Sequence, residues 1–214
     1  MKDYLKLIRV KHWLKNGLVF LPLFFSINVL NRDLLLTSTL AFFIFSITSS
    51  IVYVINDMED VEKDKKHPIK KNRPLASGRV SLTEAKIIRA VLVIVLGILL
   101  WVISKKVESI GILLIPLIYI GMNILYSKKL KNIPIIDVVV IVLGFLLRVM
   151  YGGIAIEVEV SKYLYLMIIF GSFYLGFGKR RNEIIKNGDK SRTSLSMYNK
   201  EFLDKNMRSE ERRV

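Results

Sequence analysis

Four side chains at the end of a long apolar segment have the types and spacing of a metal site. Asn56 and Asp57 come first, and Asp60 and Asp64 follow three and seven residues after Asp57. If the apolar helix continues through them, the three carboxylates share one helical face. Oxygen ligands of this kind suit Mg²⁺, so the stripe predicts a magnesium site at Asp57, Asp60 and Asp64. A solvated, charge-rich helix end would have the same composition.

The loop that follows this acidic stripe is basic. Lys70 and Arg73 lie in it, a few residues after the carboxylates. A diphosphate group needs both features, because Mg²⁺ and basic side chains together neutralise its oxygens. Residues 57–83 are therefore expected to form a catalytic loop that binds phosphate.

The composition predicts a membrane protein. Hydrophobic residues make up 52% of the 214 residues, yet the formal net charge is +15, so apolar and basic residues must be segregated along the chain. A spanning helix needs about 20 apolar residues, and about six segments qualify. They lie near residues 17–31, 38–56, 84–104, 108–126, 134–156 and 162–178. The first is short, and Pro22 predicts a kink or an irregular entry into the bilayer. The expected fold class is all-α: a polytopic helical bundle forming a single integral membrane domain over residues 1–214.

The charges of the loops predict the orientation in the membrane. Residues 1–16, the loop at 57–83, the loop after the fourth apolar segment and the tail at 179–214 are rich in Lys and Arg, whereas the alternate loops carry few. The positive-inside rule then places the amino terminus, the acidic stripe and the tail in the cytoplasm, for a multi-pass protein of the cell (inner or plasma) membrane. The excess of Lys and Arg over Asp and Glu is explained by this orientation and by attraction to anionic lipid headgroups. No nucleic-acid-binding module is recognisable, so no nucleic-acid partner is expected.

Polar residues also occur inside the apolar segments and at their ends. Arg148 lies well inside the fifth segment, where an arginine costs about 3 kcal/mol unless it faces a cavity or a partner. Asp137 enters the same segment, and Tyr126 closes the fourth together with Lys128, Lys129 and Lys131. The alternatives to a functional role are snorkelling of Arg148 and an interfacial position for the other residues.

A second cationic cluster follows the sixth apolar segment. Lys179, Arg180 and Arg181 are consecutive there, and Glu183 lies two residues further on. Arginines bind phosphate by paired hydrogen bonds, and Glu183 would either add a metal ligand or hold the arginines in place. A stop-transfer cluster has the same pattern. The sequence contains no Ser/His/Asp or Cys/His arrangement, no GxGxxG motif and no Walker loop.

Taken in order, these segments resemble the UbiA-type intramembrane prenyltransferase superfamily. The resemblance starts from the NDxxDxxxD pattern at Asn56, Asp57, Asp60 and Asp64, and covers nearly the whole chain. Within the superfamily the chain looks most like the decaprenyl-phosphate phosphoribosyltransferase branch. Residues 11–16, 67–74, 126–131, 137–148 and 178–183 carry this closer similarity.

The resemblance implies a bundle of membrane helices around a cavity with a polar cap. It also implies transfer of 5-phosphoribose from phosphoribosyl diphosphate to a polyprenyl (decaprenyl-like) phosphate, with Mg²⁺ and release of diphosphate, in the synthesis of cell-envelope polysaccharide precursors. By this resemblance Asp57, Asp60 and Asp64 are catalytic and bind the metal, and Glu183 is a further ligand. The substrate-binding residues that it implies are Lys11, Lys15, Asn56, Lys70, Arg73, Tyr126, Lys131, Arg148, Lys179, Arg180 and Arg181.

Members of the superfamily typically have about nine membrane helices, so the last third of the bundle is expected to be missing from this chain.

Two other functions stay open. A UbiA-type prenyltransferase would use the same Asp motif for a prenyl diphosphate, with an aromatic or other acceptor, and would carry a second DxxxD-like motif where only Glu183 and Asp189 occur. An inactive truncated membrane subunit or a transporter is the other. The lipid chain length and a homo-oligomeric state are not decided by the sequence.

The predicted topology can be tested by labelling, because the chain contains no cysteine. Single cysteines replacing Asn72 and Glu157 are expected to react from opposite sides of the membrane, Asn72 from the cytoplasmic side. A membrane-impermeant thiol reagent applied to intact cells and to inverted vesicles measures this. Labelling of both positions from the same side would contradict the predicted orientation.

Overall fold

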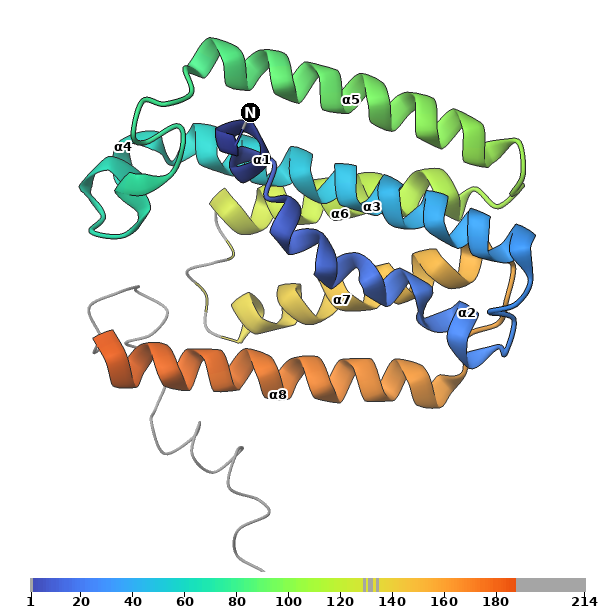
Figure 1. Cartoon of the computed structure of the whole chain (residues 1–214). Helices are drawn as coiled ribbons and strands as arrows, with labels where there is room; N and C mark the ends of the chain where they lie inside the picture. The colour runs from blue at the N-terminus through green and yellow to red at the C-terminus, as the bar shows by residue number, and fades with distance from the viewer. Residues whose placement is uncertain (1, 129, 131–132, 134, 188–214) are drawn as a thin grey trace, which may run out of the picture. The chain divides into compact units, whose positions relative to one another are not determined.

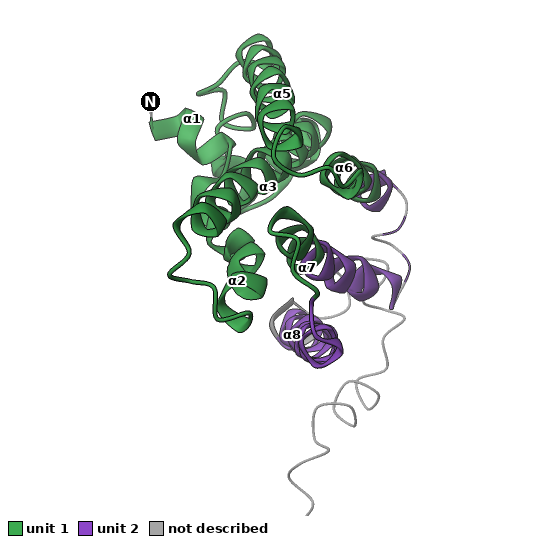
Figure 2. Cartoon of the chain, turned by 90° about the vertical axis from the view of Figure 1, so that its right-hand side faces the viewer, with its two compact units in different colours: residues 1–124, 148–159 green, residues 125–147, 160–214 purple. Residues whose placement is uncertain are grey.

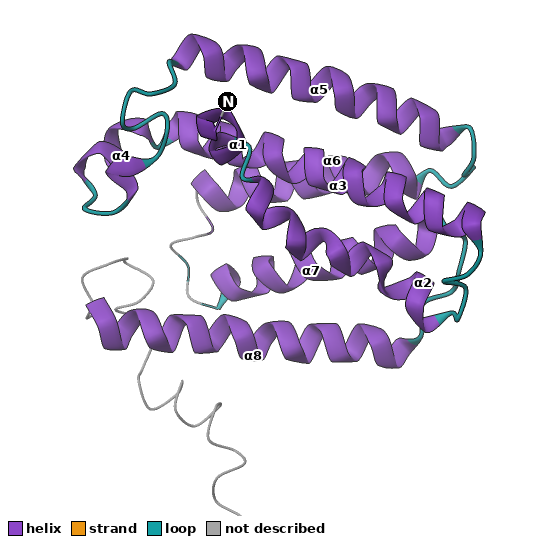
Figure 3. Cartoon of the chain, viewed as in Figure 1, coloured by secondary structure: helices purple, strands orange, loops and turns teal. Residues whose placement is uncertain are grey.

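A computed structural model describes residues 2–128, 130, 133 and 135–187, and all regular elements of this part are helices (Figures 1 and 3). The α-helices are α1 (Lys2–Leu7), α2 (Leu21–Phe25), α3 (Arg32–Glu59), α4 (Val61–Lys66), α5 (Leu82–Ser104), α6 (Gly111–Lys128), α7 (Ile136–Ala155) and α8 (Lys162–Asn187). Two 3-10 helices, η1 (Val10–Phe20) and η2 (Lys70–Asn72), lie between them. The predicted all-α class is confirmed.

Four of the described helices are long and apolar enough to cross a bilayer, namely α3, α5, α6 and α7. They coincide with the second to fifth apolar segments predicted from the sequence. Helix α3 is the longest, with 28 residues. At 1.5 Å per residue it measures about 42 Å, which exceeds the hydrocarbon thickness of about 30 Å. At least one end of α3 therefore extends out of the apolar layer.

The first and sixth predicted segments differ from a regular span. The first is divided between η1 and α2, and Pro22 occupies the first turn of α2, where its missing N–H costs nothing. The sixth forms α8, which has 26 residues. This helix is less apolar than the other four, mainly because it begins at Lys162 and its last turns contain Lys179, Arg180, Arg181 and Glu183.

The chain divides into two compact units (Figure 2). The first contains residues 1–124 and 148–159. Its central element is α3, which packs against α5 and η1. Both long helices have a defined start: the Asn31 side chain accepts hydrogen bonds from the first turn of α3, and Ser81 and Glu84 form a capping box on α5. Tyr4 donates to Glu84 Oε1 at 2.6 Å and thereby ties α1 to the start of α5.

Small polar residues on α3 hold η1 against it. Asn16 donates from Nδ2 to the hydroxyls of Ser46 and Ser49, both at 3.1 Å. Trp13 donates to Ser50 Oγ at 3.0 Å, and this hydroxyl donates in turn to the Ile8 carbonyl at 2.8 Å. Short side chains allow close approach between helices in membranes. The segment just before η1 is thus fixed beside the carboxyl half of α3.

The second unit contains residues 125–147 and 160–214. In its described part, the start of α7 packs against the carboxyl half of α8. Gly176 makes this approach possible, since a Cβ there would lie 2.6 Å from Val138 Cγ1.

A glycine in the first unit allows η1 to approach α7 closely. A Cβ at Gly152 would overlap the Val19 backbone carbonyl, so Gly152→Ala is expected to lower the thermal unfolding temperature by several degrees, because the backbone must move. Gly97→Ala in α5 is the matched control, since its Cβ would meet nothing within 4 Å and alanine favours a helix. Circular dichroism in detergent measures both. Equal unfolding temperatures for the two variants would contradict the proposed close contact.

Candidate phosphate-binding site

The acidic stripe lies at the joint between α3 and α4. Helix α3 ends at Glu59, and Asp60 takes the non-helical angles φ −96° and ψ 7°, so the condition for a shared helical face, one helix through all three carboxylates, is not met. Backbone hydrogen bonds still run from Asp60 N–H to Asn56 and from Asp64 N–H to Asp60, at 3.0 and 2.8 Å. The joint therefore keeps the backbone hydrogen-bond spacing of a helix on both sides of Asp60.

Arg73 brings two of the three carboxylates together. Its Nη1 lies 3.1 Å from Asp57 Oδ1 and 2.6 Å from Asp64 Oδ2, and both carboxylates are buried. Lys70 Nζ lies 4.0 Å from the other oxygen of Asp64. Asp60 differs, because its side chain is 25% exposed and pairs with Lys63, at 3.6 Å. Asp57 and Asp64 thus form the acidic core of the site, with a cation already between them.

The turn after α4 positions Arg73. The residue before a proline avoids helical angles, so α4 ends before His67-Pro68. His67 Nδ1 accepts the backbone N–H groups of Ile69 and Lys70, at 3.2 and 3.3 Å, which folds the chain back. Arg73 also precedes a proline, and its ψ of 147° is extended. Arg79 donates to the Asn72 carbonyl at 2.6 Å and fixes the loop just before Arg73.

Arg9 supplies the second cation to Asp57, a role that the basic composition of residues 1–16 does not predict. Its Nη2 donates to Asp57 Oδ1 at 2.5 Å, and its guanidinium lies 4.6 Å from the centre of the Tyr53 ring. The backbone of Arg9 is left-handed, with φ 53°, a conformation that is uncommon outside glycine and clusters at functional sites. The signal available in the sequence was the three-residue spacing of Lys6, Arg9 and His12.

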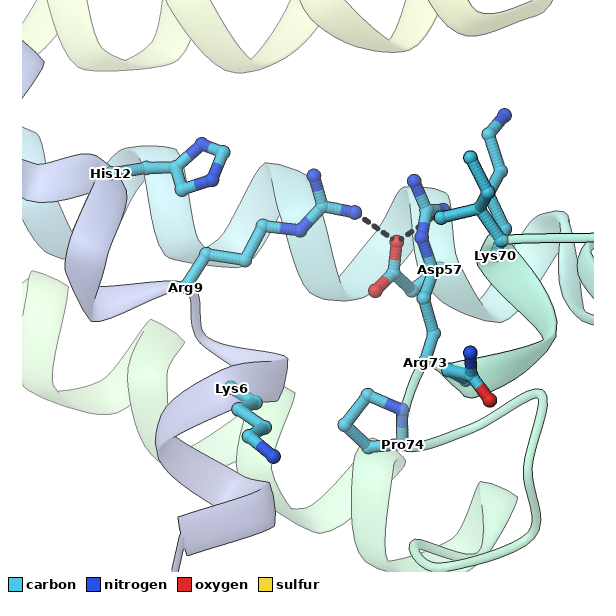
Figure 4. A pocket seen from close by; sticks show the side chains of 9 residues that line it. Lys6, Arg9, His12, Asp57, Lys70, Arg73 and Pro74 are labelled. Carbon is cyan, nitrogen blue, oxygen red and sulfur yellow. Dashed lines mark hydrogen bonds and ion pairs between the residues drawn. The ribbon is translucent and has the colours of Figure 1, made fainter.

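These groups surround an open hollow of about 450 Å³, which we call the first hollow (Figure 4). Its lining residues are Lys6, Arg9, His12, Asp57, Ile69, Lys70, Asn72, Arg73 and Pro74. Burial lowers the pKa of His12, and the positive charges of Lys15 and Arg9 lower it further. The imidazole is therefore mainly neutral at pH 7, and Lys6, Arg9, Lys70 and Arg73 provide the positive charge. Four cations around one carboxylate suit a polyanion.

The oxygen groups at this site fit Mg²⁺ only if Arg73 moves. Within the described residues, no three His, Cys, Asp or Glu side chains lie close enough to hold a metal ion. Asp57 and Asp64, however, already share one cation, the Arg73 guanidinium. Asn56 Oδ1, next to Asp57 in the chain, is also buried and has no hydrogen-bond partner among the described residues. Asp57 and Asp64 would hold Mg²⁺ once Arg73 leaves the carboxylates, and Asp60 lies at the joint between them.

Arg148, predicted to bind substrate, lies in a buried network of the first unit. Its side chain donates from Nε to Asn16 Oδ1 at 2.8 Å and from Nη2 to the Tyr119 hydroxyl at 3.0 Å. The guanidinium also lies 5.0 Å from the ring centres of Phe45 and Tyr119. At 6% exposure Arg148 does not snorkel to the surface. It does not line the first hollow either, and it secures η1 through Asn16.

Arg180 and Glu183 meet in the second unit. Arg180 is 1% exposed, and its Nη1 donates to Glu183 Oε2 at 2.6 Å. Arg180 Nε lies 2.6 Å from Asp137 Oδ2, an ion pair that lacks the orientation of a hydrogen bond. Of the two roles considered for Glu183, holding an arginine agrees with this contact. Its metal-binding role and the phosphate-binding role of Arg180 stay predictions.

The other predicted site residues lie apart from the first hollow or outside the described residues. Lys11 and Lys15 are exposed on η1, and neither lines the first hollow. Tyr126 is half-buried near the end of α6, Lys179 is exposed, and Arg181 is half-buried on α8. Lys131 and the tail from residue 188 are outside the described residues.

The chain is similar to proteins of known class over most of its length. The model of the UbiA prenyltransferase family matches residues 18–192. Decaprenyl-phosphate phosphoribosyltransferase of Corynebacterium glutamicum is 34% identical over 93% of this chain and 60% of its own length, and that of Mycolicibacterium smegmatis is 31% identical over 93% and 63%. The chain thus spans less than two thirds of the length of either relative.

A solved structure has the same fold. It is the UbiA homolog from Archaeoglobus fulgidus bound to GPP and Mg²⁺, with a TM-score of 0.73 and 19% identity over 96% of this chain and 72% of the other. This likeness agrees with the helical membrane bundle. The chain belongs to the UbiA prenyltransferase family.

Proposed function

We propose that this protein transfers 5-phosphoribose from phosphoribosyl diphosphate to a polyprenyl phosphate, with Mg²⁺ and release of diphosphate. The observation that carries the proposal is the first hollow, in which Arg73 lies between two buried carboxylates and Lys6, Arg9 and Lys70 add further positive charge. The names of the two relatives, at 34% and 31% identity, support the same reaction.

The phosphates of the sugar donor are the best match to the cations of the first hollow. Phosphoribosyl diphosphate carries a 5-phosphate besides its diphosphate, so it needs a second anion pocket away from the metal. Lys6, Arg9, Lys70 and Arg73 exceed what one metal-bound diphosphate requires. The volume of about 450 Å³ is also in the range of small-molecule sites.

Arg73 has two roles in this scheme. Without ligand it neutralises Asp57 and Asp64, and with ligand it turns its guanidinium to the diphosphate, whose oxygens accept the same paired hydrogen bonds. Mg²⁺, when bound, takes over the charge of the carboxylates and stabilises the leaving diphosphate. Lys6, Arg9 and Lys70 orient the remaining phosphate oxygens.

The chemical step needs no general base. A phosphate oxygen of the lipid forms a bond to C1 of the ribose while the bond from C1 to the diphosphate oxygen breaks, and the electron pair leaves with the diphosphate. Because the lipid phosphate is already an anion, no proton has to be removed from it. A neutral His12 in the hollow is compatible with this chemistry.

Transfer of a prenyl group from a prenyl diphosphate is the second candidate. It is favoured by the Archaeoglobus fulgidus structure, which has the same fold and is bound to GPP and Mg²⁺. Both reactions use a metal-bound diphosphate, and they differ in the group attached to it. A prenyl chain needs an apolar channel, whereas a phosphorylated ribose needs further cations.

The affinities of the sugar donor and of a prenyl donor can be compared by calorimetry on the protein in detergent with Mg²⁺. Phosphoribosyl diphosphate is expected to bind more tightly than geranyl diphosphate, and Lys70→Ala is expected to weaken it about tenfold, since a charge-assisted hydrogen bond contributes about 1.5 kcal/mol. Lys66→Ala, an exposed lysine on α4 that does not line the hollow, should leave binding unchanged. Tighter binding of geranyl diphosphate, with no effect of Lys70→Ala, would favour prenyl transfer.

If Mg²⁺ replaces the Arg73 guanidinium at Asp57 and Asp64, removal of Arg73 changes how the metal affects stability. Arg73→Ala leaves Asp57 and Asp64 buried without their shared cation, so the variant should unfold at a lower temperature without metal and gain more stability from Mg²⁺ than the wild type does. Lys65→Ala is the control, because Lys65 is exposed on α4 and pairs with Glu62 instead. The measurement is the shift in unfolding temperature on adding Mg²⁺. An identical shift in wild type and Arg73→Ala would rule out competition for the same carboxylates.

A further inference from the structure

A second hollow, of about 410 Å³, adjoins the first in the same unit. It is lined by Lys2, Leu5, Lys6, Arg9, Val10, Lys11 and His12. Lys6, Arg9 and His12 also line the first hollow, so these three side chains form a common wall. Arg9 lies at the turn between α1 and η1, and its guanidinium reaches Asp57 in the first hollow. A ligand in one hollow is therefore next to a ligand in the other.

The two hollows differ in charge. The first contains Asp57, whereas none of the described lining residues of the second is acidic. The acidic residue of α1, Asp3, lies 3.1 Å from Arg79 Nε instead. Lys2, Lys6, Arg9 and Lys11 then give the second hollow a positive charge without a carboxylate to hold a metal. Such a site attracts an anion directly.

The second hollow is also partly apolar. Leu5 and Val10 belong to its lining, and the Leu5 side chain is 53% exposed. Cations beside exposed aliphatic groups match a ligand that has a phosphate at one end and a hydrocarbon chain at the other, since each end finds its own partner. Free phosphate would leave the aliphatic groups of this surface uncovered.

We infer that the second hollow binds the phosphate end of the polyprenyl phosphate acceptor, with Lys11 and Lys2 as its own cations and Arg9 and Lys6 shared with the sugar donor. The inference rests on the proposed function, because the acceptor phosphate must reach C1 of a ribose bound next to it. The shared wall meets that requirement: it keeps the two anions adjacent and places positive charge between them. Arg9 and Lys6 would thus reduce the repulsion between acceptor and donor.

Each hollow has lysines that the other lacks, which allows a reciprocal test. Farnesyl phosphate, a short polyprenyl phosphate, is titrated calorimetrically into the protein in detergent without Mg²⁺, and phosphoribosyl diphosphate is titrated separately with Mg²⁺. Lys11→Ala is expected to lower the affinity for farnesyl phosphate about fivefold to tenfold and to leave the affinity for phosphoribosyl diphosphate unchanged. Lys70→Ala should have the opposite effect. Arg9→Ala should weaken both, and Lys66→Ala neither. Lys2→Ala provides a second variant of the acceptor hollow, and all these lysines except Lys70 are exposed.

Three further outcomes have a defined meaning. Unchanged farnesyl phosphate binding in both Lys11→Ala and Lys2→Ala would overturn the inference. Binding of inorganic phosphate or of phosphatidylglycerol as tight as that of farnesyl phosphate would also overturn it, because the site would then recognise any anion or any acidic lipid. Lys11-dependent binding of farnesyl phosphate without any binding of phosphoribosyl diphosphate would support the acceptor hollow and show that the proposed sugar donor is wrong.

Discussion

The buried carboxylate of Asp57 is the constraint on which the rest of the site depends. It is 3% exposed, and an isolated carboxylate at such a position would be strongly destabilising. Two guanidinium groups compensate for it, Arg9 from the amino-terminal segment and Arg73 from the loop after α4. Both segments must therefore converge on the end of α3. The hollow between them follows from this convergence.

Placement of the amino-terminal segment depends on a second layer of buried polar contacts. Asn16 links the serines of α3 to Arg148 of α7, so one amide side chain connects three elements of the first unit. A buried polar network of this kind stabilises a structure only when its members are satisfied. Arg148 thus acts on the site at a distance, by keeping η1 where Arg9 can reach Asp57.

Much of the fold could be predicted from the sequence, because apolar segments of spanning length are visible in composition alone. The acidic motif and the basic loop were also recognisable, since their residues are close in the chain. The pairing of Arg9 with Asp57 was not, because it joins residues 48 apart and depends on how η1 packs. The sequence did not decide whether the helix continues past Glu59, because Asp60 has no glycine or proline beside it to signal a break.

The helix type of η1 has a mechanical consequence. Its 11 residues form a 3-10 helix, a length at which this form is uncommon. A 3-10 helix rises about 2.0 Å per residue and an α-helix about 1.5 Å, so the same residues would be about 5 Å shorter in the α form. The contact between Arg9 and Asp57 tolerates only a few tenths of an ångström. The 3-10 form of η1 therefore sets the distance along the chain between Arg9, just before its start, and Phe20 at its end.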